Sequence, residues 1–200
     1  MKRLSLAIIF TCCTLVMAAQ DGAFRVNYQG ANPTIKDLAL AFITSMLNPE
    51  DEEPEGDGLY MYESLQNAIK GQPLEKNEKL TIDMKNGFLL YEKTYDEYVD
   101  RIEMCYWNEA DGKHKLFANS RWNYENGKAI LGQYDGLSFY RYDNATKKMA
   151  RCNTPGFDVE YLNTTYALPR TGKNIIVTQW DENGKKSEKT LKWNGTRFSY

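Results

Sequence analysis

Residues 98–128 read YVDRIEMCYWNEADGKHKLFANSRWNYENGK. Ile102, Met104 and Tyr106 stand at every second position among polar residues, which is the spacing of a β-strand that buries one face. The segment NEADGK then supplies turn formers, and KHKLFANSRWNY resumes the apolar and aromatic pattern. The stretch therefore predicts a long β-hairpin, and Asn126-Gly127 predicts a second turn directly after it.

The same pattern continues from residue 79 to the end of the chain. Asn-Gly pairs begin at positions 86, 126, 183 and 194, and both residue types tolerate the positive φ that tight hairpins need. An aromatic residue stands near the end of most strands that the turns separate: Trp107, Trp122, Tyr142, Trp180 and Trp193. Such rings pack across onto the partner strand. We expect about ten short strands joined by turns.

Two helices are expected before the strands. Residues 32–49 carry apolar side chains at helical spacing, with Asn32 as a candidate cap and Pro33 at the first helical position. Thr34 and Asp37 resemble a capping box. A second helix is expected over 59–71, and Gly71 is its stop signal.

These elements predict an α+β fold. We expect two N-terminal helices packed on a curved antiparallel meander, or partly closed barrel, of about 8–10 strands. A β-sandwich with peripheral helices is the alternative. Residues 153–173, with Pro155-Gly156 and Pro169, form the longest stretch expected to be irregular.

The N-terminus resembles a secretory signal. Lys2-Arg3 precedes an apolar run over 4–17 and the small pair Ala18-Ala19, in the order that signal peptidase needs. We expect residues 1–19 to be a signal peptide and 20–200 a single domain. The predicted location is exported, either periplasmic or extracellular, with no transmembrane segment. The alternative leader is that of a lipoprotein, with the lipid on Cys12 or Cys13.

The charge is unevenly distributed. The whole chain has a net charge of −2, and removal of the leader with its two basic residues makes it −4. Residues 20–112 carry a net −11 and residues 113–200 a net +7. Either the two halves attract each other within one fold, or the basic half binds an acidic partner. A secreted chain that is acidic overall is not expected to bind nucleic acid.

Cys105 and Cys152 are the cysteines that remain after the leader. In an oxidising compartment they either form a disulfide, closing a loop of about 47 residues, or pack as small apolar side chains. The sequence leaves both options open.

Catalytic signals are sparse. His114 is the one histidine, and no ligand spacing predicts a metal, while no phosphate-binding or dinucleotide motif predicts a cofactor. Cys105 with His114 is the strongest nucleophile–base candidate, but the expected hairpin register places the two side chains on opposite faces. We therefore predict no catalytic residue, although a hydrolase with another site remains an alternative.

Aromatic residues are the strongest binding signal, because the chain has 14 tyrosines and 4 tryptophans. In GQYDGLSFYRYD, Tyr140 and Tyr142 share one strand face, which is either a binding surface or part of the core. Residues 153–173 add further candidates that could line a groove. The predicted ligand-binding residues are Trp122, Tyr140, Tyr142, Tyr161, Tyr166 and Arg170.

The segments IEMCYWNEADGKHKLFA, GQYDGLSFYRYDNATKKM and KTLKWNGTRFSY together resemble small secreted proteins of unknown function from Bacteroidetes-type bacteria. The resemblance implies an exported bacterial protein and supplies no site residues. The function expected from the sequence is a non-catalytic binding protein for a glycan, a small ligand or a protein. The alternatives are a small secreted hydrolase and a structural or interaction protein of the envelope.

Overall fold

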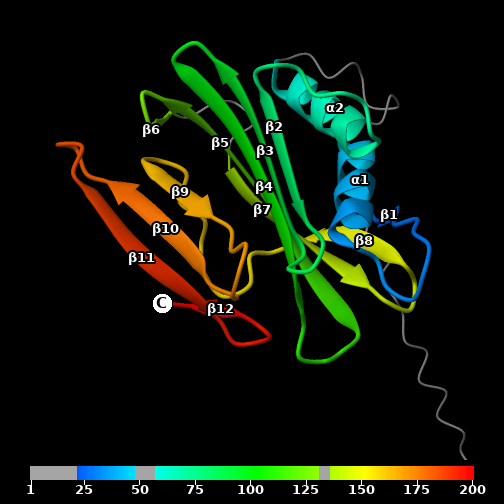
Figure 1. Ribbon diagram of the computed structural model, residues 1–200. Coiled ribbons are helices and arrows are strands. Elements are labelled where there is room, and N and C mark those ends of the chain that lie inside the picture. Colours follow the sequence, from blue (N-terminus) through cyan, green and yellow to red (C-terminus); the bar gives the residue numbers. More distant parts are fainter. Residues whose placement is uncertain (1–21, 48–56, 131–135) are drawn as a thin grey trace, which may run out of the picture.

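The computed structural model describes residues 22–47, 57–130 and 136–200. Its strands form two antiparallel sheets, and two helices lie beside the larger one (Figure 1). The chain completes the first sheet by residue 152 and builds the second from residue 164 onward. The fold is thus made of consecutive hairpins that divide between two layers.

The first sheet has eight strands, in the order β1-β8-β7-β5-β4-β3-β2 with β6 pairing to β5. Its strands are β1 (Phe24–Arg25), β2 (Glu78–Asp83), β3 (Phe88–Tyr95), β4 (Tyr98–Asn108), β5 (His114–Glu125), β6 (Lys128–Ile130), β7 (Gly136–Asp143) and β8 (Lys148–Cys152). The predicted hairpin is its centre, formed by β4 and β5. Asn126 and Gly127 both have positive φ, of 48° and 76°, between β5 and β6, as the predicted two-residue turn requires.

The second sheet has four strands, in the order β12-β11-β10-β9. These are β9 (Thr164–Ala167), β10 (Ile175–Trp180), β11 (Lys186–Trp193) and β12 (Phe198–Ser199). The prediction that all of 153–173 is irregular is wrong, because β9 lies within it. Pro169 follows the end of β9, so it interrupts no pairing with β10.

The helices are α1 (Ile35–Met46) and α2 (Asp57–Ile69). The capping box is confirmed, since the Thr34 N–H donates to the Asp37 carboxylate at 2.8 Å and the Asp37 N–H donates to the Thr34 hydroxyl. Thr34 is therefore the cap residue, and the prediction of Asn32 is wrong. Gly71, with φ of 95°, follows the end of α2 as expected. In the described part of the chain, neither helix combines the length and apolarity needed to cross a bilayer.

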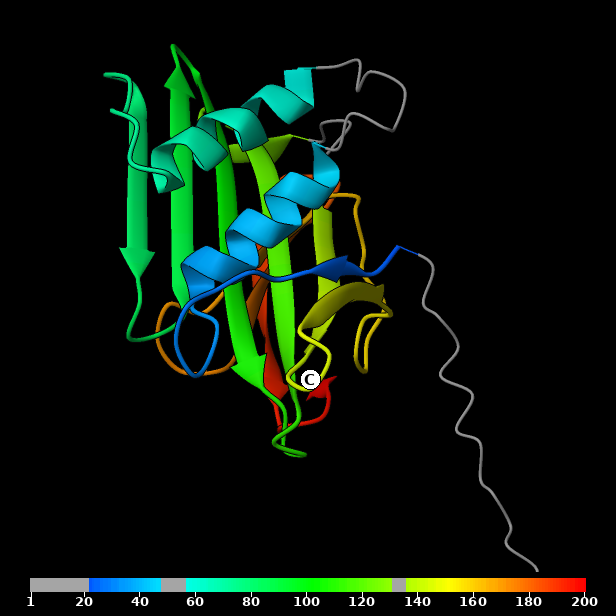
Figure 2. The same ribbon diagram turned by 90° about the vertical axis from the view of Figure 1, so that its right-hand side faces the viewer.

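Each face of the first sheet is covered by a different layer. Ile102 and Met104 of β4 share one core with both helices, in which the rings of Phe42 and Phe117 lie 5.6 Å apart. Cys105 of β4 belongs to the other core, with residues of the second sheet. Figure 2 shows the helices lying across one face of the strands. The sheet is therefore buried on both sides, which removes the polar outer face that a simple meander would have.

The antiparallel β architecture and the broad α+β class are confirmed. The partly closed barrel is wrong, because the first sheet is open and ends at β1 on one side and β2 on the other. The alternative of a β-sandwich with peripheral helices is closer to the structure. The two sheets share a core of rings and aliphatic side chains, so burial is achieved by stacking layers instead of by closing one sheet.

Candidate functional site

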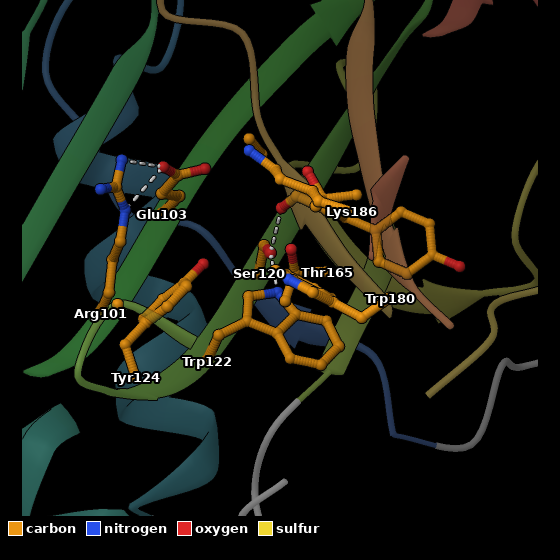
Figure 3. Close-up of a pocket in the computed structure, with 12 residues that line it drawn as sticks. Arg101, Glu103, Ser120, Trp122, Tyr124, Thr165, Trp180 and Lys186 are labelled. Atoms are coloured by element: carbon orange, nitrogen blue, oxygen red, sulfur yellow. Dashed lines mark hydrogen bonds and ion pairs between the residues drawn. The ribbon is translucent and has the colours of Figure 1, made fainter. Parts of the chain in front are cut away.

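A cavity of about 250 Å³ lies where the second sheet meets strands β4 and β5 of the first (Figure 3). Figure 3 shows Arg101 and Glu103 on one side, Trp180 and Lys186 on the other, and Ser120 and Thr165 between them. The lining combines indole and phenol rings with hydroxyl, carboxylate and cationic groups. This mixture is typical of a small-ligand site, in which a few polar groups orient a partly apolar ligand.

The register of β4 and β5 aims the side chains of the first sheet into this cavity. Arg101 pairs with Trp122 and Glu103 pairs with Ser120. These four positions are in phase with Cys105, which faces the second sheet. The inward face of β4 and β5 is thus apolar at one end of the hairpin and polar at the other, and the cavity lies at the polar end.

The second sheet meets the first along the edge of β9 (Figure 1). Tyr166 pairs with Val177, and both belong to the core between the sheets. Thr165 pairs with Thr178, so these two threonines face the other side of the second sheet, and both line the cavity. Strand β9 therefore separates the apolar core on one side from the cavity on the other.

Side chains of the first sheet satisfy the exposed backbone edge of β9. The Ser120 hydroxyl donates to the Tyr166 carbonyl at 2.7 Å, and the Leu168 N–H donates to the Glu103 carboxylate at 2.6 Å. The Trp122 indole N–H donates to the Ser120 oxygen at 2.8 Å. An edge strand normally leaves such groups to solvent, so these hydrogen bonds, here called the β9 latch, fix the cavity wall.

The charged groups of the cavity are paired within the protein. Arg101 donates to Glu103 through Nε at 2.9 Å and to Glu92 through a terminal nitrogen at 3.2 Å. Lys186 lies 2.7 Å from Glu188. Burial raises the pKa of Glu103 above its usual value, although Arg101 and the Leu168 N–H act in the opposite direction.

Three lining groups are left without a protein partner among the described residues. The hydroxyls of Thr165 and Thr178 have no hydrogen-bond partner there, although both side chains are largely buried. The half-buried indole of Trp180 contacts no other aromatic ring of the described chain, whereas Trp122 packs 6.2 Å from Tyr166. These groups are available to a ligand.

The structure brings only part of the predicted binding set together. Trp122 and Tyr166 line the cavity. Tyr140 lies on the helix side with its ring 5.1 Å from Phe42, and Tyr142 is fully buried there. The expected surface of Tyr140 and Tyr142 is therefore core.

The remaining two candidates from the long connection also lie outside the cavity lining. Tyr161 is 48% exposed and packs on Gly136, and Arg170 donates to Asp83 at 3.1 Å. They do not line a groove with Tyr166.

Sequence reasoning missed Arg101, Glu103, Thr165, Thr178, Trp180 and Lys186 as lining residues. One signal was present for the first two. They fall in phase with Cys105 and Trp107 on β4, where an apolar residue is expected on a buried face. Polar residues at core positions of a strand indicate a place where the core is interrupted.

Cys105 and Cys152 are free thiols in the structure, so of the two options left open by the sequence the disulfide is not formed. The register places them in one row, in which Cys105 pairs with Ala118, Ala118 with Phe139, and Phe139 with Cys152. Three strand steps separate their Cα atoms by about 14 Å, whereas a disulfide needs less than about 7 Å. Both side chains pack in the core between the sheets, so the apolar interpretation holds.

The nucleophile–base candidate is not assembled. His114 begins β5, four residues from the partner of Cys105, so about 13 Å of strand separates them. The prediction of opposite faces is wrong, because the register differs by three residues and places both positions on the same face. Burial raises the pKa of the Cys105 thiol well above its usual value, which disfavours the reactive thiolate.

A second polar cluster lies in the turn between β4 and β5. Oxygen and nitrogen atoms of Glu109, Asp111 and His114 lie within 4.8 Å of one another. Asp111 accepts the backbone N–H groups of Lys113 and His114 and the His114 ring. The His114 ring hydrogen bond, together with the backbone ones, lowers the pKa of Asp111 to about 2. These contacts are those of an Asx turn that closes the hairpin.

Comparisons with protein-family models, with curated proteins and with solved structures gave no match for this chain.

Proposed function

We propose that this protein is an exported, non-catalytic binding protein that holds a small ligand in the cavity beside β9. The observation that carries the proposal is a combination in one concave site: two threonine hydroxyls without a partner among the described residues, and a Trp180 indole that stacks on no described ring. The surrounding groups are held in place by the β9 latch. A fixed frame with a few open polar groups is what a preorganised binding site needs.

The chemistry of the lining favours binding over hydrolysis. Among the lining residues that the structure describes, Glu103 is the one carboxylate, and it is already occupied by Arg101 and the Leu168 N–H. Acid–base hydrolysis of a glycoside uses two carboxylates on opposite sides of the bond. Export rests on the leader-like sequence of residues 1–19, which lies outside the described residues.

A ligand screen by NMR tests the proposal. Residues 20–200 are mixed with a chemically diverse library of small compounds, and the indole N–H signals of Trp122 and Trp180 are followed. We expect hits that shift these two signals and that lose binding in Trp180→Ala, because the half-buried Trp180 supplies an open wall of the cavity.

Tyr98→Ala is the matched control. Tyr98 is an aromatic residue with 45% exposure and is not in the cavity lining, so its removal should leave binding unchanged. A library without hits, or hits that are insensitive to Trp180→Ala, would contradict the proposed function.

A further inference from the structure

We propose that the ligand of the cavity is a neutral sugar ring, held as the terminal pyranose of a glycan. This inference rests on the proposed function and specifies its ligand class. It depends on three properties of the lining: paired charges, a cross-strand pair of open hydroxyls, and an open aromatic face.

The charges of the site argue for a neutral ligand. Arg101 is bound by the carboxylates of Glu92 and Glu103, and Lys186 is paired with Glu188. An anionic ligand would meet cations whose charge is already balanced, and it would lie close to the carboxylates that balance them. Separation of Glu103 from Arg101 to make room would leave a carboxylate of 5% exposure poorly compensated. A neutral ligand leaves each of these ion pairs intact.

The open hydroxyls match a polyol. Thr165 and Thr178 are directly opposite each other across β9 and β10, so their Cβ atoms lie about 5 Å apart. A hydroxyl both donates and accepts. Two neighbouring hydroxyls thus complement two ring hydroxyls of a sugar, each of which also needs a donor and an acceptor. An apolar ligand would instead bury both threonine hydroxyls unsatisfied.

The open aromatic face lies beside the threonine pair. Trp180 is two residues after Thr178 on β10, so the two side chains share a face of the second sheet. The Trp180 indole stacks on no other ring of the described residues, and it lines the cavity. Indole faces bind the apolar C–H face of a pyranose while its hydroxyls point to polar groups.

The size of the cavity limits the ligand to about one ring. Its volume of about 250 Å³ is below the range of roughly 300–1,000 Å³ that is usual for drug-sized ligands. Lys186, whose side chain is 57% exposed, marks the side that opens to solvent. The rest of a glycan chain would therefore extend outward from the protein.

The test is a calorimetric titration of residues 20–200 with the methyl glycosides of glucose, galactose, mannose and N-acetylglucosamine, and with methyl glucuronide as the anionic comparison. We expect at least one neutral glycoside to bind with a dissociation constant in the millimolar range or tighter. Because no charge is neutralised, affinity should change less than about twofold when salt rises from roughly 0.05 to 0.5 M.

Three threonine variants distinguish the contribution of the hydroxyl to binding affinity from the contribution of the side-chain shape. Thr178→Val removes the hydroxyl at nearly constant volume and should weaken binding at least about tenfold. Thr178→Ser keeps the hydroxyl and should keep affinity within about threefold. Thr190→Val is the control, since Thr190 is on β11 and is not in the cavity lining.

The outcomes distinguish this inference from the proposed function. Binding of only the glucuronide, or affinity that is unchanged in Thr178→Val, would overturn the neutral-sugar inference and leave the binding function standing. The same holds if library compounds occupy the cavity while no glycoside binds. If neither compounds nor glycosides bind, both proposals fail.

Discussion

At the scale of single residues, the helix side of the first sheet contains charged groups that are buried in pairs. Arg121 and Asp100 are each more than 90% buried and form a two-pronged ion pair. Lys93, which is 3% exposed, donates to Glu75 at 2.9 Å and to Glu78 at 3.0 Å. Buried charges are tolerated only when they are paired. Removal of one partner leaves the other charge buried and unpaired, so it should lower the free energy of unfolding by more than the intact pair adds to it.

Glu78 gives this pairing a measurable pH dependence. Burial acts to raise its pKa, but hydrogen bonds from Tyr91, the backbone and Lys93 outweigh burial and lower the pKa below the ordinary 4.5. A carboxyl whose pKa is lower in the folded state contributes stability above its unfolded pKa, and this contribution is lost as pH falls through the folded pKa. The fold should therefore lose part of its stability below about pH 4.5 because Glu78 becomes protonated.

Urea unfolding of wild type and Glu78→Gln between pH 7 and 3 checks this prediction. We expect the variant to be less stable at pH 7 and the difference to shrink toward pH 3, where wild type has lost the same charge. Glu182→Gln, in an exposed turn, is the control and should follow wild type. A constant difference between wild type and Glu78→Gln at all pH values would show that Glu78 does not titrate in this window.

At the scale of the elements, the β9 latch holds the second sheet against the first by side-chain contacts to an edge strand. Glu103→Ala removes the acceptor of the Leu168 N–H, so that amide should exchange with deuterium faster. Glu103→Gln keeps a carbonyl oxygen at this position and should restore most of the protection. The cost of the alanine variant should be about 1–3 kcal/mol, because a buried donor loses its partner.

Hydrogen exchange measured by NMR shows whether the Glu103 contact stabilises only the edge of β9 or the whole second sheet. The Val177 amide lies in β10, one strand further from Glu103, and should keep its protection in Glu103→Ala. If Val177 and Leu168 lose protection together, Glu103 supports the whole second sheet instead of the edge of β9. If neither amide changes, the β9 latch has no energetic role.

A comparison of predicted and observed strands shows which of them the local sequence pattern could predict. Alternation and the turn formers of NEADGK predicted the central hairpin, because both are local properties of the sequence. The register was off by three residues, because the Asp111 carboxylate gathers the N–H groups of Lys113 and His114 into a wider turn. Strand β9 was missed because four residues before Pro169 carry too little pattern, and its pairing with β10 is decided by tertiary contacts.

At the scale of the whole molecule, the stacking of layers was beyond what the sequence pattern predicts. Strand β5 is buried at eight consecutive positions, from Lys115 to Trp122, because helices cover one face and the second sheet covers the other. Local alternation tells which residues share a face, but it does not tell which hairpins share a sheet. The cavity follows from this arrangement, since Arg101 and Thr165 come from different sheets.

The C-terminal β12 joins the two layers, and this gives a prediction for the whole fold. The Phe198 ring lies 4.7 Å from Trp193 of its own sheet and 5.2 Å from Trp107 of the first sheet. Its backbone N–H donates to the Pro155 carbonyl at 2.8 Å. Phe198→Ala should therefore destabilise the protein by about 3–5 kcal/mol, as expected for loss of a fully buried ring.

Urea unfolding followed by tryptophan fluorescence and by circular dichroism measures this effect. Because both sheets share the core around Phe198, the two signals should change together in wild type and in the variant, at a lower urea concentration in the variant. Tyr200→Ala removes a ring that is 62% exposed only two residues away and should change stability by less than about 0.5 kcal/mol. Separate transitions in wild type would mean that the second sheet unfolds independently of the first, and an unchanged midpoint in Phe198→Ala would mean that this ring does not join the layers.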